Sequence, residues 1–461
     1  MLVYLNPSNI NKVTHKFNLK QDSGFILVKN SILELSKVED WHFYVLVPDT
    51  ACWEDKPENV TLLEYPYVND ALNSRFHFDT NAILSVFNNY KHDIDLIWTM
   101  LPEHAGALKG FCNKRREEVP VFSYINWMDY KKTKGYEPSY KLRMIDGIKN
   151  SDAVGIQSEH MMRYMKELVK PYENEINFDN IEVINPKTHI PNVESTIGNL
   201  IAFNHRISTE SGFQPMMKLA SEHLMFKVWV TNINNVPIKS DHVISKKYDN
   251  HFEYYNELSK VRFGISYHIG YSMWSMSVLD LMAVGKVVLV PKANAFTEMF
   301  PDNYPFFFSN DEEFLSKLDY LQTCDNEVLT VWGDRNRKIV SNKFEWSKQA
   351  EELSRVFYKI IKNKKTKKTN SVYEQIHKYG AVTKGDLINK NVTDFGRQCS
   401  RAWNKCRIEL MRDFEVLDDT TSEHTVFYIK GYDITKGVTV RPEKVMTPYE
   451  KRIKERKIHE K

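Results

Sequence analysis

Cysteine is scarce in this sequence, and long hydrophobic runs are absent. Five of the 461 residues are cysteine, an odd number, and no two of them form a Cys-x-x-Cys pair. This usage indicates reduced thiols in a cytoplasm and provides no zinc-binding pattern. No apolar run approaches the roughly 20 residues that cross a bilayer, and the first residues lack the basic start and apolar core of a signal peptide. We therefore expect a cytoplasmic protein without a membrane segment.

Charge is distributed unevenly along the chain. Residues 362–461 carry 23 Lys and Arg against 14 Asp and Glu, whereas residues 1–361 carry 40 against 46. A basic block attached to a mildly acidic body suggests a separate module with an anionic partner, although a solubilising tail has the same composition. At 461 residues and 42% hydrophobic composition, two or three packed domains are expected.

Short apolar segments alternate with segments of helical length in two successive series. Such alternation predicts βαβ units and parallel sheets, and therefore an α/β protein with two Rossmann-like, doubly wound domains, at 1–190 and 197–361. A segment containing two prolines, 185–199, joins the two series. The predicted strands are 2–5, 43–47, 95–98, 119–125, 153–157 and 181–184, then 199–204, 226–231, 263–267 and 286–291.

A third pattern follows residue 361. The segment "KNKKTKKTN" (362–370) is basic, has no apolar residue to bury, and predicts a linker. Residues 371–432 predict a small winged helix-turn-helix-like α+β module, and 433–461 form a basic tail. The predicted order in the module is a helix ended by Gly380, a short helix capped by Thr383, a long amphipathic helix at 393–412 and a hairpin at 414–431.

The stretch "GYSMWSMSVLDLMAVGKVVLVPKANAFTEMF" (270–300) places small hydroxyl residues ahead of a helix. In a doubly wound domain, a phosphate binds where a strand leads into a helix N-terminus. Ser275, Met276 and Ser277 open the predicted helix and are placed to receive a diphosphate. Asp280, one turn further on, is placed to accept hydrogen bonds from ribose hydroxyls. Alternatively, the serines only cap a structural helix and Asp280 only complements its dipole.

These residues resemble the nucleotide-binding segment of GT-B glycosyltransferases of the retaining, glycogen-synthase-like type. Ser272, Trp274, Ser275, Asp280 and "AVGKVVLV" occupy the places of that family's acidic residue, aromatic step, small residue, second acidic residue and following strand. The chain departs from the family at both acidic positions, because Ser272 replaces the first and Asp280 the second. The resemblance implies a GT-B fold and a nucleotide-sugar donor.

A second match lies at "LIAFNHRISTESGFQPMMKLA" (200–220), which is similar to the family's segment at the start of the second domain. Arg206 falls on the arginine that clamps the donor diphosphate, and Ser211 falls on the family's lysine. A guanidinium clamp needs no metal. The stretch is also similar to that of bacteriophage DNA glucosyltransferases. The resemblance therefore implies a metal-independent hexosyl- or pentosyltransferase with no cofactor.

In the first domain, "FSYINWMDYKKTKGYE" (122–137) occupies the loop that carries a catalytic-site histidine in the family, and it contains no histidine. Asn126 could bind a sugar hydroxyl, and Asp129 could take the acceptor proton or stabilise developing positive charge; Asp129 could equally cap the next turn. The segment "DID" (93–95) resembles a metal-binding motif, but ordinary surface aspartates are the favoured interpretation.

The last hundred residues bear on the acceptor. In the predicted helix 393–412, Arg397, Arg401 and Lys405 recur at a spacing of four on one face, as duplex DNA binding requires. A protein-docking module would show a similar charged face. Nearer the predicted cleft, a lysine-rich loop either follows a phosphate backbone or is merely solvated; its lysines are Lys131, Lys132 and Lys134.

Together these features favour a monomeric glycosyltransferase that moves a sugar from a UDP-sugar to a hydroxylated or hydroxymethylated pyrimidine of bacteriophage DNA, in the cytoplasm of an infected bacterium. The expected partners are the nucleotide sugar and double-stranded DNA with a modified base, and no membrane. Two alternatives stay open. One is a cytoplasmic transferase of cell-surface glycan synthesis. The other is a DNA-binding regulator with a degenerate sugar-nucleotide sensor, which the losses at Ser211 and Ser272 would explain.

Overall fold

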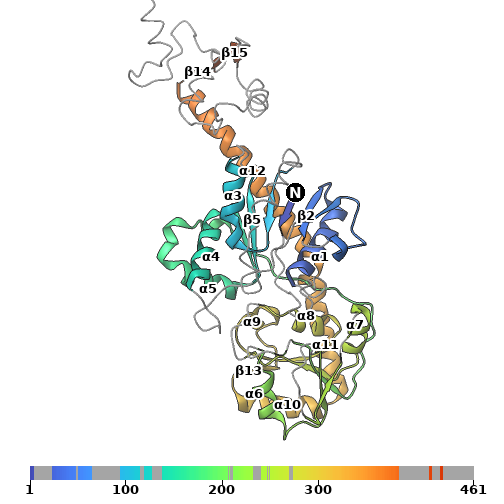
Figure 1. Ribbon diagram of the computed structural model, residues 1–461. Helices are drawn as coiled ribbons and strands as arrows, with labels where there is room; N and C mark the ends of the chain where they lie inside the picture. The colour runs from blue at the N-terminus through green and yellow to red at the C-terminus, as the bar shows by residue number, and fades with distance from the viewer. Residues whose placement is uncertain are drawn as a thin grey trace, which may run out of the picture. The chain divides into compact units, whose positions relative to one another are not determined.

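The computed structural model (Figure 1) consists of two compact units, Met1–Phe111 with Val119–Tyr358 and Cys112–Glu118 with Lys359–Lys461. The residues that the structure describes are 1–4, 23–47, 50–64, 94–114, 119–126, 138–205, 207, 211–231, 240–246, 248, 250–268, 274–379, 381–383, 415–417 and 426–428.

The first sheet has seven parallel strands in the order β3-β2-β1-β4-β5-β6-β7. The strand order reverses direction at β1, whose Leu2 pairs with Tyr44 of β2 on one side and with Ile97 of β4 on the other. The strands are β1 Leu2–Tyr4, β2 Phe43–Val47, β3 Val60–Glu64, β4 Ile97–Thr99, β5 Val121–Ile125, β6 Ala153–Ile156 and β7 Ile181–Val183. The helices are α1 Ser23–Val38, α3 Ala105–Lys114, α4 Pro138–Asn150 and α5 Glu159–Val169, with shorter 3₁₀ turns at 50–52, 102–104, 170–175 and 178–180.

The second sheet has six parallel strands in the order β10-β9-β8-β11-β12-β13, so it is wound in the same way. The strands are β8 Leu200–Phe203, β9 Lys227–Val230, β10 Val243–Ser245, β11 Phe263–Ile265, β12 Val288–Pro291 and β13 Phe307–Phe308. The helices are α6 Phe213–Ala220, α7 His251–Leu258, α8 Met276–Ala283, α9 Phe296–Met299, α10 Asp311–Thr323 and α11 Asn326–Lys343. The predicted α/β architecture with two doubly wound sheets is therefore confirmed.

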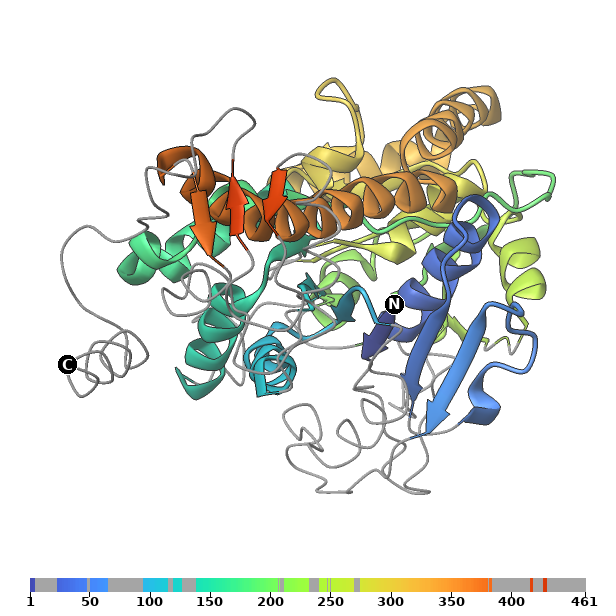
Figure 2. The same ribbon diagram turned by 90° about the horizontal axis from the view of Figure 1, so that it is seen from above.

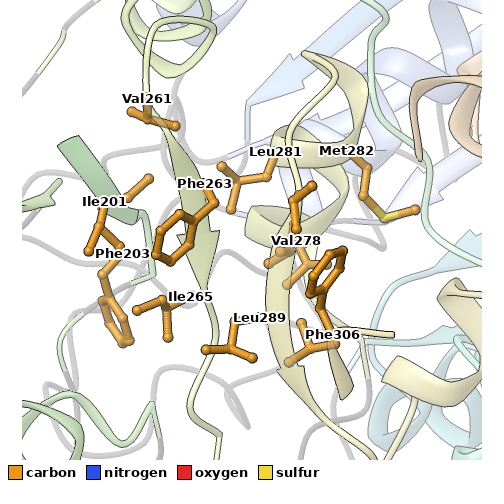
Figure 3. Close-up of a cluster of buried hydrophobic side chains, with 14 of the residues drawn as sticks. Ile201, Phe203, Val261, Phe263, Ile265, Val278, Leu281, Met282, Leu289 and Phe306 are labelled. Carbon is orange, nitrogen blue, oxygen red and sulfur yellow. The ribbon is translucent and has the colours of Figure 1, made fainter. Parts of the chain in front are cut away.

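The core of the second sheet is built where α8 packs on the central strands. Figure 3 shows Phe263 and Ile265 of β11 beside Leu281 of α8. The helix approaches closely because residue 264 is glycine, and a Cβ there would lie 2.2 Å from Leu281 Cδ1. Strands covered on both faces are largely apolar, and every residue of β12 is buried. This packing fixes the position of α8 on its sheet.

Helix α12, Trp346–Tyr379, spans the segment for which the sequence predicts a linker. In the first unit, its Phe357 ring packs against Trp98 and Phe122 of the first sheet, with ring centroids 5.7 and 5.1 Å apart. The helix continues through 362–370, so the predicted linker is helical in the structure, as the unbroken orange helix in Figure 2 shows. No glycine or proline interrupts 346–379, and lysine is a good helix former, so basic composition alone does not end the helix.

A small antiparallel sheet lies in the second unit. It has the order β14-β16-β15, with β14 Ala381–Thr383, β15 Glu415–Leu417 and β16 Val426–Tyr428, drawn as three short arrows in Figure 2. Within the predicted hairpin, β15 and β16 pair antiparallel, and the segment that connects them lies outside the described residues. The predicted helix at 393–412 lies outside the described residues, so the winged helix stays a prediction. Among the helices that the structure describes, none is both long enough and apolar enough to cross a membrane.

Candidate functional site

The N-terminus of α8 lies at the carboxyl edge of the second sheet. Ser275 is the N-cap, and its Oγ accepts a hydrogen bond from the Val278 amide at 3.3 Å. Ser277 Oγ donates to the Asn204 carbonyl at 3.0 Å, and Asn204 Nδ2 donates back to the Ser277 carbonyl at 2.9 Å. Since Asn204 directly follows β8, these bonds fasten the first turn of α8 to the end of the neighbouring strand. Met276, between the two serines, packs against the core.

Asp280 is held by three hydroxyl donors. Thr188 Oγ1 and the Tyr255 hydroxyl donate to Oδ1 at 2.8 and 3.1 Å, and the Tyr254 hydroxyl donates to Oδ2 at 3.1 Å. Burial raises the pKa of the Asp280 carboxyl, and the three hydrogen bonds oppose that rise. A carboxylate has about four acceptor positions. Among the residues that the structure describes, these bonds use three of the positions, so the remaining one is on Oδ2.

Ser211 lies at the start of α6, at the same edge of the sheet. Its side chain is buried, and the following residue, Gly212, is the N-cap of α6 with a φ of 69°. A Cβ at Gly212 would lie 2.0 Å from the carbonyl oxygen of Tyr267, which follows β11. Glycine is required there for two reasons, the left-handed backbone and the close approach of Tyr267.

Trp274 precedes the α8 cap and is partly buried. Its indole packs edge-on against Phe344, with ring centroids 5.5 Å apart. The indole Nε1 is buried and has no hydrogen-bond partner in the described structure. A buried N–H without a partner costs free energy.

Asn126 directly follows β5 of the first sheet, and its Oδ1 accepts a hydrogen bond from Gln157 Nε2 at 3.2 Å. This bond directs the amide oxygen of Asn126 toward Gln157. Asp95, of the "DID" segment, precedes β4. Across the described ranges, no group of three His, Cys, Asp or Glu side chains is arranged to hold a metal ion. The other predicted site residues lie outside the described residues: Arg206, Ser272, Asp129, Lys131, Lys132, Lys134, Arg397, Arg401 and Lys405.

Two histidines were not anticipated from the sequence. His205 and His268 follow the neighbouring strands β8 and β11, and their ring centroids lie 5.0 Å apart. Burial, together with the His268 charge, lowers the pKa of His205 well below its usual value, so its imidazole is neutral at physiological pH. A polar residue just after each of two adjacent parallel strands was the signal that could have found them.

Glu298 was also missed. Its carboxylate accepts hydrogen bonds from the backbone amides of Glu159 and His160, at 2.8 and 2.6 Å, at the N-terminus of α5. The contact joins α9 of the second sheet to α5 of the first. A negative charge at a helix N-terminus is favourable because the first amides lack intrahelical acceptors.

Solved structures share the fold of the two large sheets at low sequence identity. Sucrose-phosphate synthase from Thermosynechococcus elongatus has a TM-score of 0.61 and 10% identity, over 78% of this chain and 99% of that one. Anabaena HepE (Alr3699), in complex with UDP and glucose, has a TM-score of 0.59 and 10% identity over the same shares of each chain. The apo form of WaaB, a lipopolysaccharide outer core galactosyltransferase, has a TM-score of 0.54 and 10% identity, again over 78% and 99%.

The chain has the GT-B fold. This confirms the fold that the sequence resemblance implied for the two large α/β sheets. No protein-family model and no curated protein matches the sequence. On the second sheet, Ser211 precedes α6, the helix after β8, whereas Trp274, Ser275, Met276, Ser277 and Asp280 lie just before or within the first two turns of α8, the helix after β11.

Proposed function

We propose that this chain is a glycosyltransferase that uses a UDP-sugar as donor. The observation that carries the proposal is the N-terminus of α8, capped by Ser275 and fastened through Ser277 to the end of β8. Free amides at a helix N-terminus attract a diphosphate, and the hydroxyl-bearing residues leave room for it. A solved structure of the same fold, Anabaena HepE, contains UDP and glucose, which supports the same class of donor.

The donor-site residues take distinct roles. The amides of the first turn of α8 and the Arg206 guanidinium neutralise the diphosphate, beside Ser211. The open position on Asp280 Oδ2 accepts a ribose hydroxyl. Trp274 Nε1 donates to the donor, and Ser272 lies near the transferred sugar. Because the helix amides and Arg206 neutralise the leaving group, the reaction needs neither a divalent metal nor a cofactor.

Transfer breaks the bond between the anomeric carbon and the UDP oxygen and forms a bond from that carbon to an acceptor hydroxyl. UDP leaves with the electron pair, and its negative charge develops at the α8 amides. Asp129 takes the proton of the acceptor hydroxyl, and Asn126 Nδ2 donates to a sugar hydroxyl. The enzyme acts as a monomer in this scheme.

For the acceptor we propose duplex bacteriophage DNA with a hydroxymethylated pyrimidine, modified in the cytoplasm of the infected cell. The reason is the basic block at 362–461 and the predicted recognition face of Arg397, Arg401 and Lys405. The lysine-rich loop at Lys131, Lys132 and Lys134 follows the DNA backbone. Ordinary bases lack a suitable hydroxyl, and the base must leave the stack to reach an enclosed site. The fold shared with WaaB favours a second acceptor class, a cell-surface glycan.

The test is mass spectrometry of nucleosides after the full chain is incubated with UDP-glucose and duplex DNA, either hydroxymethylated or unmodified. We expect a hexosylated nucleoside from the modified duplex alone. Arg206→Ala should lower the rate by a factor equivalent to about 2–4 kcal/mol, as for a lost anion-hole donor. Turnover of the donor with a glycan acceptor but not with DNA would reject DNA as the acceptor and support a cell-surface glycan in its place. A chain that binds UDP but turns over no donor would instead be a sensor.

A further inference from the structure

Tyr254, on α7, joins two parts of the donor edge through one hydroxyl group. It donates a hydrogen bond to Asp280 Oδ2 at 3.1 Å and accepts one from Asn204 Nδ2 at 2.8 Å. Asn204 Nδ2 also donates to the Ser277 carbonyl at 2.9 Å. The hydroxyl therefore connects the second turn of α8 to the end of β8 and, through Asn204, to the first turn of α8.

The chemistry of these groups determines the direction of each bond. An ionised carboxylate only accepts, and an amide nitrogen only donates, so the phenol must give its proton to Asp280 and receive one from Asn204. Burial, followed by the charge of Asp280, raises the pKa of Tyr254 well above its usual value, so the phenol keeps its proton. The orientation of the hydroxyl is therefore set from both sides.

The adjacent residue, Tyr255, provides a comparison. Its hydroxyl donates to Asp280 Oδ1 at 3.1 Å and lies 3.3 Å from Thr188 Oγ1. Thr188 donates to the same oxygen, so Oδ1 is fully used by two hydroxyls of this chain. The two tyrosines thus hold different oxygens of one carboxylate, and Tyr254 alone of the two shares its oxygen with the open acceptor position.

We propose that Tyr254 is a positioning residue that directs Asp280 Oδ2 toward a ribose hydroxyl of the donor and thereby makes the site selective for a ribonucleotide. The inference rests on the proposed function. Tyr254 fills one of the two acceptor positions on Oδ2. Its hydrogen bond fixes the orientation of the carboxylate and therefore the direction of the second acceptor position. Without the Tyr254 hydroxyl, the carboxylate can turn, and water can occupy the vacated position.

The test compares Tyr254→Phe with the matched variant Tyr255→Phe in the full chain. Calorimetry measures the affinity for UDP, 2′-deoxy-UDP and 3′-deoxy-UDP. The wild type should prefer UDP over at least one deoxy analogue by about tenfold or more, because a hydrogen bond to a charged acceptor has about that effect. Tyr254→Phe should bring this ratio close to one while the affinity for the deoxy analogue stays near the wild-type value. Tyr255→Phe should keep the ratio.

A double-mutant comparison separates positioning from folding. Asp280→Asn should lose the ribose preference, and adding Tyr254→Phe to it should remove no further preference. Equal weakening of all three ligands by Tyr254→Phe, or a ratio unchanged from the wild type, would overturn the inference. A wild type that binds UDP and its deoxy analogues equally would also overturn it and leave the donor-site proposal standing. A wild type that binds none of them would overturn both.

Discussion

Lys187 and Glu352 form an ion pair between residues 165 positions apart in the sequence, with 3.0 Å from Nζ to Oε1. The Lys187 side chain is 1% exposed and that of Glu352 is 35% exposed. Burial lowers the pKa of Lys187, and the charge of Glu352 opposes this shift. The pair attaches the segment after β7, which leads into the second sheet, to helix α12.

Removing one partner of this pair should cost more than removing both. Glu352→Gln leaves the buried Lys187 ammonium without its counter-charge, and we expect a loss of at most about 3 kcal/mol, since Glu352 is partly exposed. The double variant Lys187→Met, Glu352→Leu buries no charge and should be more stable than Glu352→Gln alone. Urea unfolding measures both. A double variant less stable than Glu352→Gln would contradict this reasoning.

Two glycines with similar backbone angles should differ in their tolerance of alanine. Gly285 has a φ of 74°, and a Cβ there would find nothing closer than 3.5 Å, so Gly285→Ala should cost about 1 kcal/mol for the left-handed backbone. Gly212 has a φ of 69°, and its Cβ would also collide with the Tyr267 carbonyl, so Gly212→Ala should cost about 3 kcal/mol or more. Equal losses of stability for the two variants in thermal unfolding would show that the contact with the Tyr267 carbonyl adds no cost at Gly212.

Lys286 should make stability depend on pH. Its ammonium donates to the Thr196 carbonyl at 2.7 Å, and burial lowers its pKa to about 7, against about 10.4 in an unfolded chain. Between these values the unfolded chain binds more protons than the folded chain, so stability rises with pH across this window. Below about pH 7 both states are protonated, and the cost of burying the charge is fully present.

The check is the stability of the wild type relative to Lys286→Met, measured by urea unfolding at several pH values from about 7.5 to 9.5. The difference should shift in favour of the wild type by up to about 1.4 kcal/mol per pH unit. Other groups titrate in both proteins and cancel in the comparison. A difference that is independent of pH would show that Lys286 titrates normally.

Sugar transfer should survive exhaustive chelation of divalent metals. In the proposed mechanism, the α8 amides and Arg206 neutralise the leaving diphosphate, so neither magnesium nor manganese has a role. The measurement is the initial rate with UDP-glucose after treatment with a strong chelator. A complete loss that manganese or magnesium restores would direct attention to Asp93 and Asp95 of the "DID" segment.

DNA binding should depend on the predicted recognition face. Charge reversal at Arg397 and Arg401 removes two phosphate contacts, so the slope of log K against log salt should become shallower by about 2. Reversing Lys451 and Arg452 in the basic tail changes the net charge by the same amount and is the control. Fluorescence anisotropy on a labelled duplex at several salt concentrations measures both. Identical slopes for the two variants would show that Arg397 and Arg401 contribute no more to DNA binding than other basic residues, which would contradict the predicted recognition face.

The sequence by itself was sufficient for the two parallel sheets and the capped helix of the site. A parallel strand such as β12 is buried on both faces, so it appears as a continuous apolar run that needs no tertiary information, and in β5 only Ser123 interrupts such a run. Ser275 was predictable because a cap is a local interaction within one turn. The strands that the pattern missed are β3, β10, β13 and β14. All four lie at sheet edges, where one side of the strand is unpaired and a short or partly exposed segment is sufficient.

Only the tertiary structure decided how the site is held together. Asp280 meets Thr188 and Tyr254, which lie 92 and 26 residues earlier in the chain, because α7, α8 and the segment after β7 converge beside the second sheet. The pairing of Lys187 with Glu352 is decided in the same way. Hydrophobic periodicity reports which face of an element is buried, but not which distant element covers that face. A polar contact between two such elements therefore leaves no pattern in the sequence, and it forms only when packing brings donor and acceptor within hydrogen-bonding distance.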